Sequence, residues 1–321
     1  MYKTGELAAQ RIESYCRTWR LWIDNAEGVI SGNSIMSADS SMQATSLSDD
    51  IELGAVCSQS WQLSIADSSE NFLGKEYDLS LYLVDYSHGE TTYSTLESYT
   101  YAELSKLTVE QISKLGEVLD GERIPLGRFT CVKSKKSGGN TEVTFADRLY
   151  FSDKVYKPNV TLPAWSKAIE DDICKQLGLQ NGNDYTIPAK LRVKGGARLY
   201  GKGHIRLKTA NFDFKINTVP KDTTMRQMLS YIASAQGEFG FVDRYGRYVR
   251  KWYGSSVKIL DNNTIDLPTL GERPNILAGI VCKVSDSETL RLGNTTGSTG
   301  RVLEFENPYM TSSLLQSLWH R

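Results

Sequence analysis

The chain contains very few residues of the kinds that carry catalysis or bind metals. Only three histidines occur among its 321 residues, His88, His204 and His320. None of them stands at metal-ligand spacing from a cysteine or from another histidine. The sequence also lacks a Gly-x-Ser-x-Gly elbow and a cysteine in a nucleophile signature. We therefore interpret the histidines as loop or surface residues and assign no catalytic, cofactor-binding or metal-binding residue.

Cysteine is scarce, and its five positions are scattered. The number is odd and no two cysteines are closely spaced, which argues against a secreted disulfide scaffold and indicates reduced thiols and assembly in a cytosol. No apolar run approaches the ~20 residues that a membrane-spanning helix needs, and no targeting segment is present. The five residues are Cys16, Cys57, Cys131, Cys174 and Cys282.

Charge of one sign is not in excess, because 37 Lys and Arg residues stand against 38 Asp and Glu residues. This balance gives no indication of nucleic-acid binding or of disorder. The basic run at 133–136 is short and is interpreted as a solvated strand face.

Glu170, Asp171 and Asp172 are consecutive, so in a helix they point in different directions and cannot form an acid/base pair. Their place in the early turns of a predicted helix, where the macrodipole favours negative charge, accounts for them.

Two glycine-rich segments have no clear chemistry. The segment "GNTTGSTGR" at 293–301 lacks the Gly-Lys-Ser/Thr ending of a phosphate loop and precedes a predicted strand, so we interpret it as a loop between strands. The basic segment "KGGARLYGKGHIR" at 194–206 has the composition to contact a polyanion. A hairpin excursion at a domain surface is the preferred interpretation.

The first half of the chain shows the two-residue period of β-strands. Apolar and polar residues alternate in four segments, which predicts half-buried strands. The last segment follows a turn at 138–140, where Gly-Gly-Asn tolerates positive φ. Short strands joined by polar turns are preferred over a linker for 31–57. The apolar positions are Trp19, Leu21 and Ile23; Trp61, Leu63 and Ile65; Leu79, Leu81 and Leu83; and Val143 and Phe145.

Helical periods are most pronounced in the second half, although 4–16 and 107–115 also predict short helices. One helix is predicted in the stretch 162–179 and a stronger one after Lys221, which Asp222 or Thr223 caps. A hairpin turning at Tyr245-Gly246 and further strands follow. The buried stripes are Trp165, Ile169, Ile173 and Leu177, ended by Gly178, and Met225, Met228, Leu229 and Ile232, ended by Gly237.

These patterns predict an α+β fold that is mostly β. We expect a Greek-key-like β-barrel domain over 1–155, a small α+β insertion domain over 160–253, and the start of a second β-barrel over 255–321. The last residues, "MTSSLLQSLWHR", predict a helix whose apolar stripe stops without a cap. An incomplete last domain is the corresponding expectation.

Three stretches, taken in order and spacing, resemble one known family. They are "RTWRLWID" with the Ser-rich segment and strand that follow it, "IPLGRFTCVKSKKSGGNTEVTFADRLYFSDK" with Asp147 and Arg148 in place, and "TTMRQMLSYIASAQGEFGFVDRYGRYVRKWY". The chain resembles the baseplate hub proteins of tailed bacteriophages, the group that includes the amino-terminal part of tail-associated "tail lysin" proteins. It is most similar to prophage versions from Gram-positive hosts, and the resemblance covers nearly the whole chain.

The resemblance implies a structural role. Hub proteins form a homotrimer that closes the distal end of the tail tube, and two related β-barrels per subunit adapt the hexameric tube to the trimer. It implies tail-tube, distal tail and tape measure proteins as partners, a place at the virion tail tip after assembly in the bacterial cytoplasm, and no enzymatic activity or cofactor. The chain departs from the family pattern after Arg321, where the second barrel normally continues, and it lacks a peptidase or lysozyme module.

Two other functions stay open on the residues. One is a peptidoglycan-cleaving tail enzyme, which needs an acidic residue in a pocket or a Cys/His pair. The other is a glycan-binding tail module that uses some of the 17 Tyr and 6 Trp residues, whose spacing does not decide the question.

Overall fold

The computed structural model describes residues 18–25, 28–30, 34–41, 52–66, 70–84, 123–183, 213–252, 277–296 and 300–319. The chain divides into two compact units. Unit 1 comprises 1–40, 61–145 and 257–269, and unit 2 comprises 41–60, 146–256 and 270–321. Strands outnumber helices among the described residues, so the predicted class, α+β and mostly β, is confirmed.

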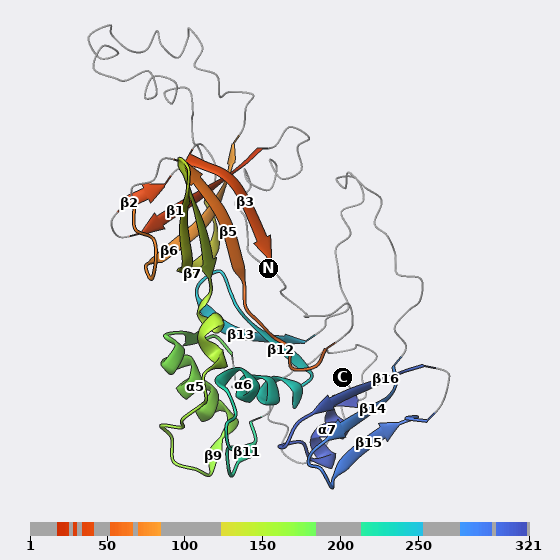
Figure 1. Ribbon diagram of the computed structural model, residues 1–321. Coiled ribbons are helices and arrows are strands. Elements are labelled where there is room, and N and C mark those ends of the chain that lie inside the picture. Colours follow the sequence, from red (N-terminus) through yellow and green to blue (C-terminus); the bar gives the residue numbers. More distant parts are fainter. Residues whose placement is uncertain are drawn as a thin grey trace, which may run out of the picture. The chain divides into compact units, whose positions relative to one another are not determined.

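The described part of unit 1 is built on one seven-stranded sheet with the order β2-β1-β6-β7-β8-β5-β3 (Figure 1). β1 pairs antiparallel with β2 and β6, and β6 pairs antiparallel with β7. Among the described strands β2 and β3 are the sheet edges, and closure into a Greek-key barrel stays a prediction. The strands are β1 Thr18–Asn25, β2 Gly28–Ile30, β3 Ile35–Ser41, β5 Ser60–Ala66, β6 Glu76–Val84, β7 Arg123–Ser137 and β8 Asn140–Ala146.

The two-residue period correctly predicted the buried face of this sheet, because successive side chains of a strand point to opposite faces. The ring of Tyr77 meets Phe145 edge-on, with 5.2 Å between centroids. All four residues of the basic run at 133–136 are exposed, in agreement with the expectation that the run is solvated. The hairpin turns at Gly138 and Gly139, whereas Asn140 already belongs to β8. Leu81 is partly buried, and the side chains of Trp19 and Leu83 lie outside those that the structure describes. The buried predicted residues are Leu21, Ile23, Trp61, Leu63, Ile65, Leu79, Val143 and Phe145.

A bulge interrupts the pairing of β6 with β7. Leu79 faces Gly127, but the next residue, Ser80, faces Pro125, so one residue of β7 is left over. Gly127 has φ +145, a conformation that L side chains rarely adopt, and a Cβ there would lie 3.1 Å from the ring of Phe129. A glycine therefore fits the bulge, and Pro125 is tolerated in the strand because bulges relax the ladder.

The described part of unit 2 contains a four-stranded sheet with helices against it (Figure 1). The sheet has the order β10-β13-β12-β4, and β12 pairs in parallel with β4 and antiparallel with β13. α6 packs on β12 and contacts α5. The elements are β4 Val56–Cys57, η3 Arg148–Asp153, β9 Ala164–Trp165, α5 Ser166–Leu177, β10 Gln180–Asn181, β11 Lys215–Ile216, α6 Met225–Ser234, β12 Glu238–Val242 and β13 Arg247–Trp252.

Both predicted helices of this part are present, with corrections at their first residues. Trp165 was predicted on the buried stripe of α5 but is half exposed, because it precedes the helix as its N-cap and pairs in β9. The cap of α6 is Thr224, and Asp222 or Thr223 was the wrong prediction. The hydroxyl of Thr224 accepts from the Gln227 N–H, and the Gln227 side chain accepts from the Thr224 N–H, a capping box.

The predicted helix ends and apolar stripes agree with the structure. Gly178 ends α5 in the left-handed conformation at φ +70, where glycine has no Cβ penalty. Gly237 follows the last turn of α6 at φ +69. The remaining stripe residues, Ile169, Ile173, Leu177, Met225, Met228, Leu229 and Ile232, lie in one buried cluster.

A separate three-stranded sheet ends the described chain. Its strands are β14 Leu277–Lys283, β15 Thr289–Gly293 and β16 Arg301–Glu306, and α7 Ser312–Trp319 packs on them (Figure 1). β14 pairs antiparallel with β15 and in parallel with β16. The sequence predicted β14, β16 and α7 but missed β15, since its only apolar residues are Leu290 and Leu292. Between β14 and β16 the sequence had predicted only the polar, glycine-rich loop, and not the strand that precedes it.

Residues 52–60 belong to unit 2, although the strands before and after them lie in unit 1. The described residues of 146–155 also belong to unit 2, together with those of 160–252 and 277–319. The division into three consecutive domains stays a prediction. The helices predicted at 4–16 and 107–115 lie outside the described residues. No helix among the described segments has both the length and the apolar character to cross a bilayer.

Candidate functional site

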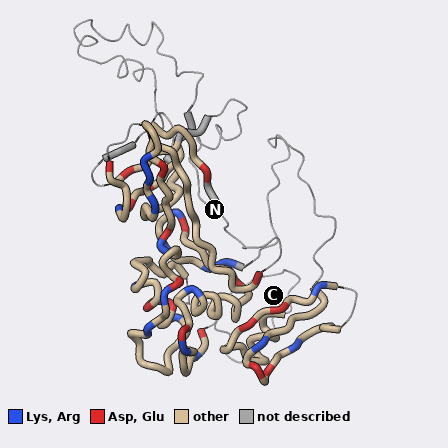
Figure 2. The backbone as a smooth tube through the Cα atoms, in the orientation of Figure 1, with Lys and Arg blue, Asp and Glu red and all other residues tan. Residues whose placement is uncertain are grey.

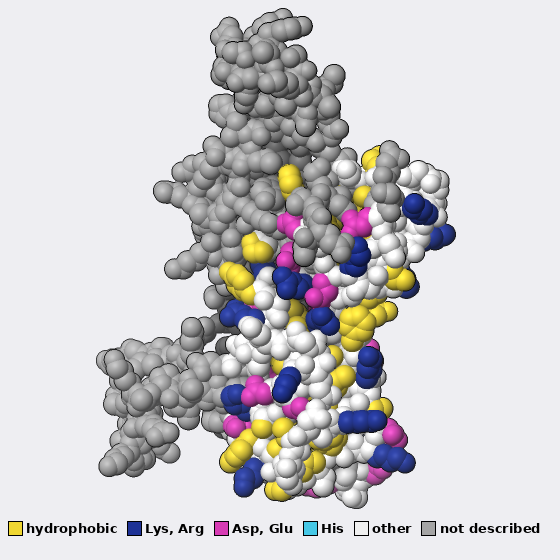
Figure 3. Space-filling view, turned by 90° about the vertical axis from the view of Figure 1, so that its left-hand side faces the viewer, with side chains coloured by type: hydrophobic (Ala, Val, Ile, Leu, Met, Phe, Trp, Pro, Cys, Tyr) yellow, Lys and Arg dark blue, Asp and Glu magenta, His cyan; other side chains and the backbone are white. Residues whose placement is uncertain are grey.

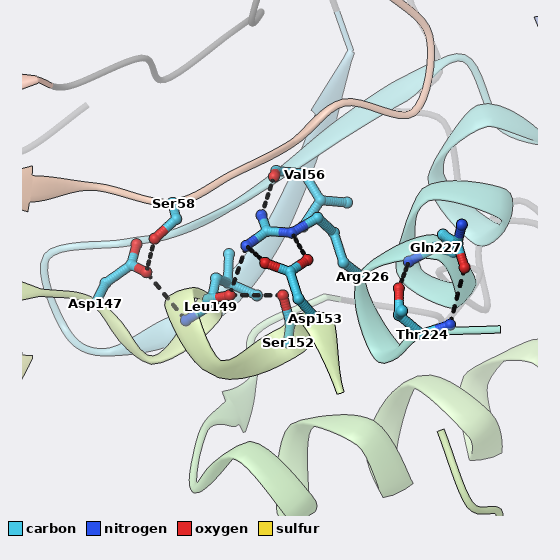
Figure 4. Close-up of polar contacts among 9 residues, drawn as sticks. All are labelled: Val56, Ser58, Asp147, Leu149, Ser152, Asp153, Thr224, Arg226 and Gln227. Carbon is cyan, nitrogen blue, oxygen red and sulfur yellow. Dashed lines mark hydrogen bonds and ion pairs between the residues drawn. The ribbon is translucent and has the colours of Figure 1, made fainter. Parts of the chain in front are cut away.

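One connected polar cluster of unit 2 surrounds Asp147 and Arg226 (Figure 4). Asp147 directly follows β8, and Arg226 lies in the first turn of α6. Both side chains point toward the chain at 56–59, and the two sides of this cluster are up to 170 residues apart in the sequence. We call this arrangement the polar junction.

Asp147 is buried, and both oxygens of its carboxylate accept hydrogen bonds. Its carboxylate accepts hydrogen bonds from the Ser58 hydroxyl at 2.7 Å, the Gln59 N–H at 2.8 Å and the Leu149 N–H at 3.0 Å. The last bond caps η3 and fixes the turn that follows the strand. Burial raises the pKa of Asp147 to about 6, while the hydrogen bonds to Gln59, Ser58 and Leu149 act in the opposite direction. One carboxylate thus ties the end of β8 to residues 58–59.

Arg226 binds the other end of the same segment. Its Nη1 donates to the Val56 carbonyl at 2.7 Å, and its Nη2 donates to the Leu149 carbonyl at 2.9 Å. The guanidinium also forms a two-pronged ion pair with Asp153, of 2.6 and 3.3 Å. A planar fork with five donors can satisfy three such partners at once, which an ammonium group cannot do in the same geometry. Arg226 therefore clamps β4, η3 and α6 together.

A second buried cluster joins α5 to the β12–β13 hairpin. Arg250 on β13 lies 3.0 Å from Glu170 on α5 and 2.8 Å from Glu238 on β12. The side chains of Arg250 and Glu170 are fully buried. Asn183 donates to Glu170 and accepts from the Arg250 N–H. Buried charges persist only when they are paired, so this cluster holds the helix and the hairpin in one position.

The three consecutive carboxylates of α5 have separate roles that the sequence did not predict. Asp172 accepts from the Tyr156 hydroxyl at 2.8 Å and from both nitrogens of Asn159. Burial alone raises its pKa, but the bonds from Asn159, Tyr156 and Gln176 bring the pKa below its usual value. Asp171 pairs with Lys167 near the surface. The prediction that these carboxylates do not converge is correct, but Glu170 and Asp172 are buried anchors rather than simple partners of the helix dipole.

The described residues offer no obvious reactive group. The four described cysteines are buried and free, and burial raises the pKa of Cys57, Cys131 and Cys282 to about 11. Within the described ranges, no group of three His, Cys, Asp or Glu residues is placed to hold a metal ion. His88, His204, His320 and the basic segment 194–206 lie outside those ranges.

Two hollows occur on the described surface. One, of about 380 Å³, lies on the sheet of unit 1 and is lined mainly by polar and charged residues of β3, β5, β7 and β8, including Asp39, Lys133 and Glu142. Its lining contains no aromatic residue, whereas a glycan platform of the kind considered above depends on Trp or Tyr. The other, of about 390 Å³, lies on unit 2 beside the polar junction and includes Arg148.

The polar junction was only partly visible in the sequence. Asp147 and Arg148 had been noted through the family resemblance, without a role. Arg226 and Arg250 were missed, because nothing local distinguishes an arginine that pairs across more than sixty residues from a surface arginine. The Thr-x-x-Gln pattern at 224–227 is a capping-box signature and would have placed the start of α6.

No known family profile matches the chain, and no curated protein matches it. Several solved structures resemble it over most of its length, including the following three. The 43 kDa tail protein of prophage MuSo2 from Shewanella oneidensis is 10% identical and covers 92% of this chain and 74% of its own, with a TM-score of 0.45. A tail protein from Neisseria meningitidis is 11% identical and covers 94% and 74%, with a TM-score of 0.47. A prophage tail protein from Listeria monocytogenes is 10% identical and covers 94% and 76%, with a TM-score of 0.42.

Proposed function

We propose that this chain is a structural component of a phage or prophage tail, the baseplate hub that closes the distal end of the tail tube. In this proposal the chain is not an enzyme. It self-associates as a homotrimer, contacts the tail-tube and distal tail proteins and the tape measure protein, and resides at the virion tail tip after assembly in the bacterial cytoplasm. The sequence resemblance described above is the source of these partners and of this location.

One observation on the structure supports the proposal most directly. The buried charged groups of unit 2 bind segments that are far apart in the chain: Asp147 and Arg226 hold 56–59, and Arg250 holds α5 against the β12–β13 hairpin. Groups that are fully paired in this way stabilise one conformation and have little capacity left for chemistry. A component that transmits position within a symmetric assembly needs this kind of rigidity.

The proposal includes the domain scheme. A Greek-key-like barrel over 1–155, an α+β insertion over 160–253 and the start of a second barrel over 255–321 give each subunit two barrel positions. Three subunits then present six positions to a hexameric tube. The seven-stranded sheet of unit 1 and the three-stranded sheet of β14–β16 are the described elements from which these barrels would be built.

Mass measurement and tube binding test the proposal together. The full 321-residue chain is analysed by light scattering, alone and after mixing with a tail-tube protein of the same phage. We expect a species of three chains, and rings or capped tubes by electron microscopy. A chain that stays monomeric and leaves the tubes uncapped contradicts the hub role.

The alternative functions have their own readouts in the same preparation. Clearing of a cell-wall zymogram by the purified chain indicates a peptidoglycan-cleaving enzyme, and micromolar binding on a glycan array indicates a glycan-binding module. The hub proposal predicts neither result. Either positive result, in the absence of tube binding, replaces it.

A further inference from the structure

The hollow on unit 2 is a basic pocket with an apolar wall. It lies between the residues that follow η3 and the C-terminal end of α5. Arg148, Lys154 and Lys157 contribute positive charge to its lining, and Val155, Leu177 and Met225 contribute apolar surface. No Asp or Glu is among its lining residues. We call this site the basic pocket.

Two carboxylates that lie close to the basic pocket in the sequence are already paired. Asp153 binds Arg226, and Asp172 accepts from Tyr156 and Asn159. Lys154 and Lys157 are exposed, and neither forms an ion pair with another residue in the part of the chain that the structure describes. The charges of these two lysines are therefore available to an outside partner.

A projecting turn of unit 2 has the opposite charge. The turn at 285–288 joins β14 to β15, and its tip is marked red in Figure 2. Asp286 and Glu288 are both exposed, and Asp286 projects fully into solvent. Lys283 lies 3.0 Å from Asp286 and 3.6 Å from Glu306, so one lysine stands against three carboxylates. The turn itself carries two negative charges, and the same net charge of minus two results when Lys283 and Glu306 on the adjoining strands are included.

The acidic turn is also held in one conformation. The Val284 N–H donates to the Glu288 carbonyl at 2.9 Å, and the Glu288 N–H donates to the Ser285 hydroxyl at 3.1 Å. A turn that is ordered before binding loses less conformational entropy on docking. The acidic turn and the basic pocket are therefore complementary in charge, and one projects while the other is hollow.

We propose that the acidic turn at 285–288 of one copy docks into the basic pocket of a second copy. The two surfaces lie on different elements of unit 2, so each copy can offer its turn to one neighbour and its pocket to another. Such head-to-tail contacts produce a closed ring when the rotation between copies closes. This inference rests on the proposed self-association of the chain and names the contact that carries it.

Figure 3 shows one face of the molecule with its side chains coloured by type. The described side chains there show hydrophobic groups in small clusters among charged ones. The proposed docking is based on charge complementarity between the lysines of the pocket and the carboxylates of the turn, which gives specificity and a fast association rate. We accordingly expect the self-association to weaken as ionic strength rises, because salt screens exposed charges.

Zero-length cross-linking tests the contact directly. A carbodiimide joins a lysine to a carboxylate only when the two touch. Equal amounts of ¹⁴N- and ¹⁵N-labelled full-length chain are mixed, cross-linked and digested for mass spectrometry. We expect mixed-isotope peptides that join Lys154 or Lys157 to Asp286 or Glu288.

Charge reversal tests the energetics. The pocket variant K154E/K157E should weaken self-association about 10-fold, as the turn variant D286K/E288K should, since each inverts two exposed charges. A mixture of the two variants should associate more tightly than either alone, because the reversed charges match again. K133E/K135E, which reverses two exposed lysines of β7 in unit 1, is the matched control and should leave the mass unchanged.

The outcomes separate this contact from the hub proposal. If the chain forms trimers but the cross-links are missing and both charge variants assemble normally, the contact is wrong while the hub role stands. If cross-links and charge rescue appear but no tube is bound, the contact stands and the hub role fails. If the wild-type chain is monomeric, leaves the tubes uncapped and forms no mixed-isotope peptide, both are overturned.

Discussion

The buried polar residues of the two units differ in kind. In the described part of unit 1 the buried polar side chains are Ser80, Thr130 and Thr141, none of which carries a charge. All five buried charged residues that the structure describes lie in unit 2, and they are Asp147, Glu170, Asp172, Glu238 and Arg250. The two units therefore achieve order by different means.

Backbone connectivity explains this difference. The sheet of unit 1 satisfies its backbone groups through long antiparallel ladders, such as the seven-residue pairing of β1 with β6, so its buried face needs only apolar side chains. Unit 2 assembles separate pieces of chain, including 52–60, whose β4 pairs with only two residues of β12. Short ladders position these pieces weakly. Buried ion pairs and hydrogen-bonded side chains therefore fix the relative positions of these segments, although burying the charges costs desolvation free energy.

The largest expected effect is the loss of a buried charge in unit 2. Arg250→Met leaves Glu170 and Glu238 buried without their cation, and we expect it to lower the free energy of unfolding by about 5 kcal/mol. Guanidinium denaturation followed by fluorescence measures this loss. Arg291→Met, the same change at an exposed position of β15, is the control and should stay within about 0.5 kcal/mol of wild type.

A result near zero for Arg250→Met would contradict the importance of the buried charges. The triple variant E170Q/E238Q/R250M sharpens the test. It removes both orphaned charges and should recover part of the lost stability. Failure of that recovery would attribute the loss to the shape of the arginine side chain rather than to its charge.

The second effect concerns the apolar core of unit 1. Phe145→Ala removes a fully buried ring that packs on Tyr77, and we expect a loss of about 4 kcal/mol from lost burial and the cavity left behind. The same denaturation experiment measures it. Leu73→Ala, at a side chain that is 57% exposed, should change little. If the units unfold in separate transitions, Phe145→Ala should shift one and Arg250→Met the other.

The same difference explains how much the sequence could predict. In unit 1 the alternation of Trp61, Leu63 and Ile65 specified the strand and its buried face, because that information is local. In unit 2 the periodic apolar residues of α5 and α6 likewise predicted the buried faces of both helices. The partners of Arg226 and Arg250 could not be predicted, since an ion pair between residues eighty positions apart leaves no periodic signal in either segment.

Errors at element boundaries had local causes. Trp165 continued the four-residue period of α5, but the strand pair with β11 places it before the helix. Thr224 was passed over as the cap because three candidate residues stand in a row at 222–224, and only the reciprocal bond with Gln227 decides between them. The parallel pairing of β14 with β16 was equally invisible, as direction depends on the long connection between them.

The third effect is a pH dependence that belongs to unit 2. Burial raises the pKa of Asp147 to about 6, above its value in the unfolded chain, so the folded protein binds the proton more tightly. The contribution of this group to stability is therefore present below about pH 4 and is lost as pH rises to about 6, a change of roughly 3 kcal/mol. Denaturation of wild type and Asp147→Asn at several pH values isolates it, because other carboxylates cancel in the difference.

The prediction is tested by the direction in which the stability difference between wild type and Asp147→Asn changes with pH. The advantage of wild type over Asp147→Asn should shrink as pH rises from 4 to 6 and stay level above. Asp172, whose pKa is lowered, gives the opposite trend, since its stabilising effect is lost as pH falls. A wild-type advantage that grows with pH would mean that the hydrogen bonds of Asp147 outweigh its burial.

The smallest effect comes from one substitution made in both units. Arg226→Lys in unit 2 and Arg128→Lys in unit 1 each replace a two-pronged arginine–aspartate pair. We expect Arg226→Lys to cost about 2 kcal/mol, because the carbonyls of Val56 and Leu149 also lose their donors. Arg128 and Asp78 are largely exposed, so Arg128→Lys should cost under about 1 kcal/mol. Thermal or chemical denaturation measures both losses of unfolding free energy. Equal losses would show that the arginine–aspartate pair alone determines the cost, and that joining distant segments adds nothing. The contrast between the two units would then have no physical basis.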